Sequence, residues 1–150
     1  MAYKSQVTIT RPANTTAYTA GDVVGGVIEF KDIPKGASAL LTSCDLRPNL
    51  AAIPSGMTSF RLHLYDGTPP SALADNAVWD LPSGDRAGYI GYIDLGSPAD
   101  LGATLFAQVD QVNKHVCPGA GLFGYLVTNG AFTPAAVSET YAVTLRGVAI

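Results

Sequence analysis

Short runs of alternating apolar and polar residues dominate the chain. Alternation with a period of two, in segments rich in Val, Ile, Thr, Tyr and Phe, is typical of β-strands that bury one face. Eight such segments follow one another: SQVTITR, GGVIEFKDI, ALLTSCDL, FRLHLY, AGYIGYIDLG, TLFAQVDQV, LFGYLVT and ETYAVTLRGVAI. The segments between them contain the Gly, Pro, Asn, Asp and Ser residues that form turns and interrupt strand pairing. The pattern therefore predicts about eight β-strands.

No segment of about a dozen residues keeps the period of an amphipathic helix. The nearest is ADLGATLFAQVDQV, where apolar residues fall at positions 101, 105, 109 and 112, so that a short helix and a strand are both open there. The predicted fold class is all-β: a single domain over residues 1–150, with about eight strands in a β-sandwich of jelly-roll type. An up-and-down barrel would need tighter and more regular hairpin turns.

The composition changes the picture of the surface. Charged residues make up 14% of the 150 residues, against about 25% in an average protein. A domain of this length buries a substantial core, so small and neutral polar residues must cover much of its surface. Burying such a surface leaves few desolvated charges, which suits a subunit that packs against neighbours.

Charge and hydropathy also exclude classes of function. The formal net charge is -3, and the 9 Lys and Arg residues are scattered, whereas phosphate binding needs a basic face. We therefore expect no nucleic acid as a partner. The chain has no run of about eighteen apolar residues and no apolar signal core near its start, so we expect neither a membrane span nor a secretory leader. We expect the protein to be made and used in a cytosol, or released from one by lysis.

The cysteines and histidines form no recognised metal or redox motif. Cys44 and Cys117 lie too far apart for a zinc knuckle or a CxxC pair, and in a reducing compartment we expect two buried thiols rather than a disulfide. His63 lies on the polar side of FRLHLY, and His115 follows a lysine. No HxH or HExxH spacing is present. We expect ordinary surface or interface histidines and no metal.

The segment DGTPPSALADNAVWDLPSGD, residues 66–85, holds the main candidates for chemistry. Asp75, Asp80 and Asp85 occur where turns use an aspartate to hydrogen-bond the backbone, and we favour that role over a catalytic acid and base. No nucleophile elbow, Walker loop or dinucleotide fingerprint is present, and GAGLFG lacks the helix that should follow such a fingerprint. The sequence predicts no enzyme and no cofactor.

Trp79, the only tryptophan, lies in the same segment. A tryptophan offers a large apolar area and one donor, so it can plug one end of the sandwich, anchor a protein interface or stack on a sugar. Plug and anchor are equally supported, and a sugar platform ranks behind them because sugar sites usually show several exposed aromatic residues. The segment is predicted to be a long exposed crossover loop, and loops of this length are usually functional.

Three stretches of the chain together resemble small virion proteins of tailed bacteriophages. They are YKSQVTITRPANTTAYTAGDVVGG near the start, FRLHLYDGTPPSALADNAVWDL with GDRAGYIGYIDLG in the middle, and AFTPAAVSETYAVTLRG near the end. In them the chain is similar to capsid decoration proteins, also called cement or head-stabilising proteins. The resemblance implies a jelly-roll-like fold, a homotrimer and the clamping of neighbouring major capsid subunits at three-fold or quasi-three-fold positions. It brings no catalytic residues.

The same resemblance implies the major capsid protein as partner and the capsid surface of the virion as location, after assembly in the host bacterial cytoplasm. We expect contacts from the long loop, with Trp79 as anchor, and from an N-terminal arm within residues 1–16. The predicted interface residues are Tyr3, Arg11, Tyr18, Pro69, Pro70, Asp75, Asn76 and Trp79.

Three other interpretations are open. A fibre or tail accessory module would bind host polysaccharide and attach to a tail instead of a shell. A small enzyme would require Asp75, Asp80 or Asp85 to converge in one pocket. A plain structural subunit, including a small major shell protein, would assemble unaided into closed particles.

Overall fold

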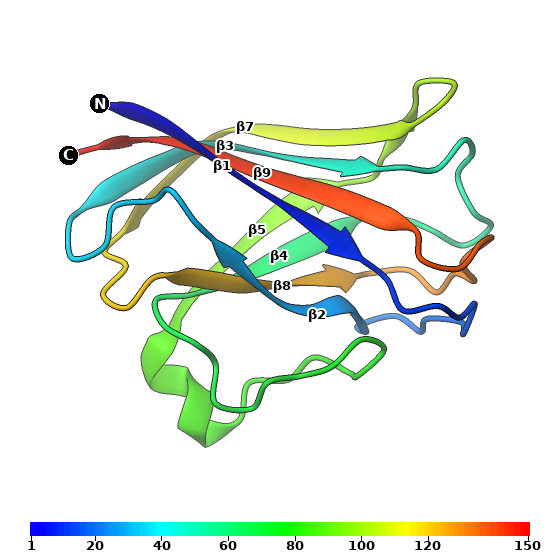
Figure 1. The fold of residues 1–150 in the computed structure, drawn as a ribbon, viewed down its shortest axis with the longest axis horizontal. Helices are drawn as coiled ribbons and strands as arrows, with labels where there is room; N and C mark the ends of the chain where they lie inside the picture. The colour runs from blue at the N-terminus through cyan, green and yellow to red at the C-terminus, as the bar shows by residue number, and fades with distance from the viewer.

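The computed structural model describes residues 1–150 as two antiparallel β-sheets packed face to face (Figure 1). The five-stranded sheet has the order β1-β9-β3-β7-β6, and the four-stranded sheet has the order β2-β8-β4-β5. The strands are β1 (Ala2–Thr10), β2 (Val23–Phe30), β3 (Ala39–Pro48), β4 (Phe60–Tyr65), β5 (Tyr89–Gly96), β6 (Ala99–Asp100), β7 (Leu105–Val116), β8 (Leu122–Thr128) and β9 (Thr140–Ala149). A 3-10 helix, η1 (Ser83–Gly88), precedes β5, and no helix has the length and apolarity needed to cross a membrane.

The strand pairing is nested and defines a jelly roll. β4 pairs with β5, β3 with β7, β2 with β8 and β1 with β9, so that a double-stranded ribbon wraps into two sheets. Eight strands arranged in this way, as two Greek keys, form the jelly-roll sandwich. β6 adds only 2 residues at the sheet edge beside β7. The predicted all-β sandwich is confirmed, and the structure adds the strand order.

Each of the eight predicted segments overlaps one strand. FRLHLY and LFGYLVT coincide with β4 and β8, and the other strands differ from their segments only in their ends. The segment that left a helix open contains β6 and the first part of β7, where the β-branched Val109 pairs with Cys44 of β3. Neither β6 nor η1 is predicted, because two residues or a single turn leave no period to detect.

The core lies between the two sheets, on one side of each strand. Phe60, Leu62 and Leu64 of β4 are buried there, as their spacing predicts. Val143 and Leu145 of β9 are buried in the same core. β9 lies between β1 and β3 and pairs with both, which explains why so apolar a segment is ordered.

β1 contains most of the segment expected to form an N-terminal arm. Residues 2–10 pair continuously with β9. Ile9 packs so closely against Gly25 of β2 that a Cβ atom at Gly25 would overlap the Ile9 side chain. Gly25 also has a φ of +87°, a left-handed conformation that favours glycine. Residues 2–10 are therefore an integral strand, and only residues 11–16 of the expected arm leave the sheet.

The two cysteines are free thiols in different surroundings. Cys44 of β3 is buried in the core, as predicted. Cys117 is exposed, with its Sγ 3.8 Å from His115 Nε2, which differs from the prediction of a buried thiol. The difference arises because Cys117 follows the end of β7, in a Pro-Gly connection to β8.

Candidate functional site

The loop between β4 and β5, residues 66–88, is attached to the four-stranded sheet. Asn76 N donates to Val23 O at 2.8 Å, and Trp79 N donates to Gly21 O at 2.9 Å, so the middle of the loop extends along β2. Figure 1 shows the loop in green below β2 and β8. The loop is largely exposed, as predicted, but its middle is bound to the start of β2 and the residue pair before it, because β2 is an edge strand with unpaired backbone groups.

Trp79 covers a buried histidine on the outer side of β4. The rings of Trp79 and His63 are stacked, with centroids 3.6 Å apart and planes 11° apart, and Trp79 Nε1 donates to Tyr65 Oη at 3.0 Å. His63 is 3% exposed, which corrects the expectation of a surface histidine. Strand alternation correctly predicts that His63 lies on the outer side of β4, away from the core. The β4–β5 loop covers that side and buries the histidine. Trp79 thus caps a sheet face, and its role as an interface anchor stays a prediction.

Burial changes the titration of His63. Desolvation by the surrounding rings, with a further effect of the Arg61 guanidinium, lowers the pKa of His63 to about 4, against a weaker opposing effect of Asp94. Its Nδ1 lies 2.9 Å from the Tyr89 hydroxyl. The imidazole is therefore neutral near pH 7 and contributes packing rather than charge.

A buried polar network joins this loop to two other parts of the chain. Tyr18 Oη donates to Asp75 Oδ1 at 2.5 Å, and Arg11 Nε donates to Tyr18 Oη at 2.7 Å. The same Asp75 oxygen accepts a hydrogen bond from Gly25 N at 2.8 Å. Arg11 Nη1 lies 3.9 Å from Glu139 Oε1, and both side chains are buried. The network therefore holds together the connections before β2, before β9 and before β5.

The tyrosine in this network stays protonated. Burial raises the pKa of Tyr18, and the hydrogen bond to the Asp75 carboxylate raises it further, whereas the guanidinium of Arg11 has the opposite effect. A permanent hydroxyl donor facing a carboxylate acceptor is a stable pair. The arrangement acts as a structural clamp rather than as a site of proton transfer.

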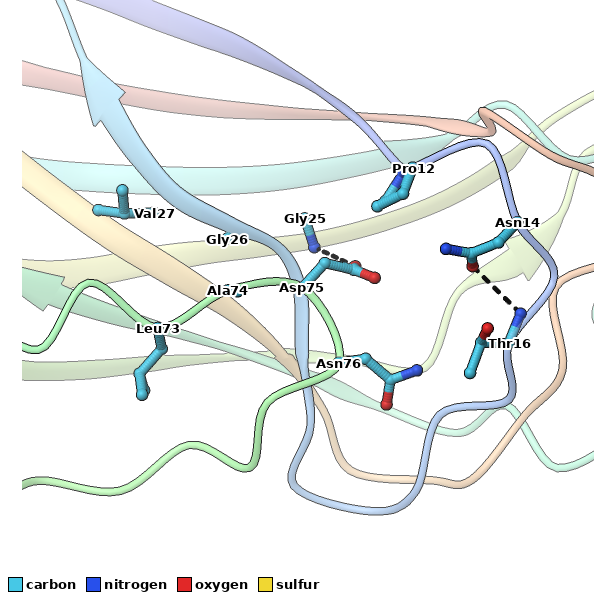
Figure 2. Close-up of a pocket in the computed structure, with 10 residues that line it drawn as sticks. All are labelled: Pro12, Asn14, Thr16, Gly25, Gly26, Val27, Leu73, Ala74, Asp75 and Asn76. Carbon is cyan, nitrogen blue, oxygen red and sulfur yellow. Dashed lines mark hydrogen bonds between the residues drawn. The ribbon is translucent and has the colours of Figure 1, made fainter.

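The surface beside the network is hollowed into a groove. Figure 2 shows this groove between residues 12–16, β2 and residues 73–76, with Asp75 directed toward Gly25. Its volume is about 600 Å³, and Asp75 is the only charged residue that lines it. Asn76 also lines the groove and donates from Nδ2 to a backbone carbonyl at 3.0 Å. A partner entering the groove would meet small uncharged groups and a carboxylate that is already hydrogen-bonded.

The other carboxylates of the loop do not converge on this groove. Asp85 is buried in η1, where its carboxylate accepts hydrogen bonds from the backbone and the hydroxyl of Ser71. Asp85 is thus structural, but it binds Ser71, 14 residues earlier, and not the backbone of its own turn as predicted. Asp80 is exposed. No group of three His, Cys, Asp or Glu side chains is placed to hold a metal ion.

The predicted interface residues do not form one surface. Tyr3 lies on β1 against Gly147, and its hydroxyl is buried without a hydrogen-bond partner. Pro69 is buried, and Pro70 is exposed near the start of the loop. The structure brings together four of the eight: Arg11, Tyr18, Asp75 and Asn76. Contact between any of the eight and a partner stays a prediction.

Four connections form a surface with almost no charge at one end of the sandwich, termed here the loop end (Figure 1, right). The loop end comprises residues 11–22, 49–59, 97–104, which include the two residues of β6, and 129–139. These connections contain four charged residues, of which Arg11, Asp22 and Glu139 are buried and only Asp100 is exposed. Sequence composition shows that charge is scarce, but only the structure shows where it is missing.

The loop end also exposes large apolar side chains. Ile53, Leu101 and Val137 are 43%, 61% and 55% exposed. A hollow of about 330 Å³ lies between residues 49–54 and 135–139 and is lined mostly by alanine, leucine and proline. Backbone hydrogen bonds connect the loops, including one from the segment before β2 to the segment before β9 at 2.9 Å. The loop end is thus a fixed, uncharged and partly apolar surface.

The outer side of β4 and β5 carries a second feature, which sequence reasoning missed. Cross-strand pairing sets Arg61 opposite Asp94 and His63 opposite Tyr92. Tyr92 is 48% exposed, and Arg61 Cζ lies 4.1 Å from its ring centroid. We term the three rings around His63 the aromatic patch: Trp79, Tyr89 and Tyr92. Alternation in GYIGYID would place Tyr89 and Tyr92 on opposite sides of β5, and the register shift that brings both to His63 cannot be read from the sequence.

Comparisons with known proteins give similarities only among solved structures. No protein-family model and no curated protein matches the chain. It is similar to a chain from the capsid of Ralstonia phage GP4, with 15% identity, a TM-score of 0.41, and coverage of 99% of this chain and 83% of that one. A chain of the cyanophage Pam1 capsid asymmetric unit has 10% identity, a TM-score of 0.39 and coverages of 97% and 83%. The jelly-roll assignment rests on the strand order and not on these scores.

Proposed function

We propose that the protein is a virion structural protein that decorates the outer capsid surface and binds it through the loop end. The observation that carries the proposal is that four connections expose Ile53, Leu101 and Val137 but only one charged residue, Asp100. Charged residues are depleted at the centre of protein interfaces, because desolvating an unpaired charge is costly. The resemblance of the sequence to decoration proteins agrees with such a surface.

If the protein assembles as a homotrimer, a weak contact per subunit would be enough for tight attachment to the capsid. Three equivalent contacts on a symmetric shell act together through effective concentration, so a weak contact per subunit becomes a tight attachment. Each contact would bridge neighbouring subunits of the major capsid protein. The bridges would then oppose the outward pressure of packaged DNA.

The buried network makes the loop end rigid before docking. Arg11, Tyr18 and Glu139 belong to the loops of this surface, and Asp75 ties them to the β4–β5 loop. A preformed surface loses little conformational entropy when it binds. In this proposal Arg11, Tyr18 and Asp75 are buried beneath the interface and hold its loops in place. Asn76 lines the groove beside it.

Sedimentation with shells of the virion that lack this protein tests the proposal. Light scattering of the purified protein first gives its oligomeric state. We expect a trimer that sediments with the shells at a fixed ratio to capsid subunits. Val137→Asp should weaken this binding at least tenfold, because the new carboxylate would be desolvated in the contact. Trp79→Ala tests the anchor role, and unchanged trimer and capsid affinity would remove Trp79 from the interface.

The matched control is Ile150→Asp, which places the same charge at an exposed apolar residue near the opposite end of the sandwich (Figure 1). This variant should bind shells like the unmodified protein. A monomer that ignores shells would overturn the proposal. Equal loss of binding in Val137→Asp and Ile150→Asp would show that the loop end is not the contact surface.

A further inference from the structure

The aromatic patch brings rings of the β4–β5 loop and of β5 together around His63 of β4. His63 lies at its centre, with centroid distances of 3.6 Å to Trp79, 5.9 Å to Tyr89 and 5.7 Å to Tyr92. The rings belong to the loop, to the start of β5 and to the middle of β5. Partly exposed aromatic rings of this kind offer flat apolar surface to the C–H face of a pyranose. Sequence reasoning ranks a sugar platform low because it sees one aromatic residue in the loop, whereas the structure supplies three.

Hydrogen-bonding groups adjoin these rings. Arg61 Nε donates to Asp94 Oδ1 at 2.8 Å, and this pair lies directly beside Tyr92. The contact leaves the terminal amino groups of Arg61 and Oδ2 of Asp94 for a ligand. A donor and an acceptor side by side match neighbouring hydroxyl groups of a sugar, each of which can accept and donate. Because the two charges already compensate each other, the pair carries no net charge that would select an acidic sugar, and the only other charged residue of the adjoining groove is Lys114.

A groove continues from the patch between β5 and β7. Its volume is about 390 Å³, and its lining includes Tyr92 of the patch, the adjoining Asp94, and Gln111, Asn113 and Lys114 from β7. Gln111 and Asn113 have φ values of +57° and +50°, left-handed conformations that are uncommon for residues other than glycine. They lie where the β3–β7 register shifts. Backbone strain of this kind concentrates at ligand sites, and both side chains carry amides that suit hydroxyl groups.

From these features we propose that the aromatic patch and the β5–β7 groove form a binding site for a neutral oligosaccharide. One pyranose stacks on the patch, with hydroxyls on Arg61 and Asp94. The next sugar residues follow the groove toward Gln111 and Asn113. This activity is separate from docking through the loop end and does not depend on it.

The size of the patch favours a sugar over a protein partner. A fully buried aromatic side chain contributes about 150–250 Å². Three rings that are already partly covered therefore provide much less than the roughly 800 Å² per partner of a stable protein interface. The ring cluster is also bordered by the exposed Arg61–Asp94 pair, which a protein contact would have to desolvate. Sugar hydroxyls can replace the water at this pair instead.

The fluorescence of Trp79 reports directly on the patch, because it is the only tryptophan. The purified protein is titrated with maltoheptaose, cellohexaose and mannohexaose, and with oligogalacturonate as an acidic counterpart. We expect a saturable change in emission with at least one neutral oligosaccharide and weaker binding of the acidic one. Tyr92→Ala and Asp94→Asn should each weaken the binding at least tenfold while leaving the far-ultraviolet circular dichroism unchanged.

A matched control comes from a similar trio elsewhere. Arg47 Cζ lies 5.4 Å from the Phe106 ring centroid, and Arg47 Nε lies 3.4 Å from Asp45. Phe106→Ala therefore removes a comparable ring and should leave sugar binding intact. No saturable change with any neutral oligosaccharide at tens of millimolar, or tighter binding of oligogalacturonate, would overturn the proposal. Loss of shell binding in Tyr92→Ala would also overturn it and assign the patch to a protein contact. Failure of shell binding in the unmodified protein would leave the sugar titration unaffected.

Discussion

His63 makes the stability of the folded chain sensitive to acid. Its pKa is about 4 in the folded protein, below the ordinary value of 6.5 for an exposed histidine. Near pH 7 the imidazole is neutral in both the folded and the unfolded chain. As the pH falls from 6.5 toward 4, the unfolded chain binds a proton that the folded chain does not. The free energy of unfolding therefore decreases across this window, and the loss from this group levels off below it.

We predict that this histidine reduces the free energy of unfolding by up to about 3 kcal/mol between neutral pH and the lower end of the window. His63→Phe keeps a ring beneath Trp79 but cannot titrate, so its stability should fall less over the same range. Urea unfolding at several pH values measures the difference. His115→Gln, which changes an exposed histidine, should follow the unmodified protein. Identical pH dependence in His63→Phe and the unmodified protein would contradict the prediction.

At the residue scale, the sequence predicts which side of a strand a residue occupies. It does not predict what covers that side. Alternation correctly buries Leu62 and Leu64, yet it leaves His63 on a polar surface because the covering loop follows no period. The contact between Tyr18 and Asp75 joins residues 57 positions apart, and no local sequence pattern predicts it. The residues of the candidate sites depend on tertiary contacts of this kind.

Deleting β1 tests whether this segment is an integral strand of the sheet or a dispensable arm. Its nine residues pair with β9 along the full length, and Ile9 packs into the space that Gly25 leaves. We predict that deletion of residues 1–10 exposes the edge of β9 and opens the core, so that cooperative thermal unfolding is lost and the chain aggregates. Differential scanning calorimetry and light scattering measure both effects. A deletion variant that keeps a cooperative transition near the original Tm would show that the segment is a dispensable arm.

At the element scale, the strands are predictable because burial of one face imposes a period of two on each of them. The connections are less predictable. The β4–β5 loop is correctly expected to be long, but its attachment to β2 depends on an edge strand that the sequence does not reveal. β6 and η1 are too short to leave a pattern. The helix left open within residues 101–112 is excluded by pairing of β7 with β3.

At the scale of the whole molecule, charge is distributed unevenly. The net charge is -3, yet the loop end exposes a single charged residue, Asp100. We predict that capsid binding through this surface changes less than threefold between about 50 and 500 mM NaCl, because screening acts on exposed charges and not on apolar contact. Sedimentation at both salt concentrations measures this. A steep loss of binding with salt would indicate an electrostatic contact elsewhere on the molecule.

The nested pairing of the strands also affects the order and the rate of folding. The β4–β5 pair can close early, since a single loop joins the two strands, but β1 must wait for β9, whose residues come near the end of the chain. Closing such distant pairs is entropically expensive, so folding is expected to be slow for a domain of this size. During synthesis, the five-stranded sheet cannot be completed until β9 has left the ribosome. Until then the nascent chain carries an unpaired β1 and depends on protection from aggregation.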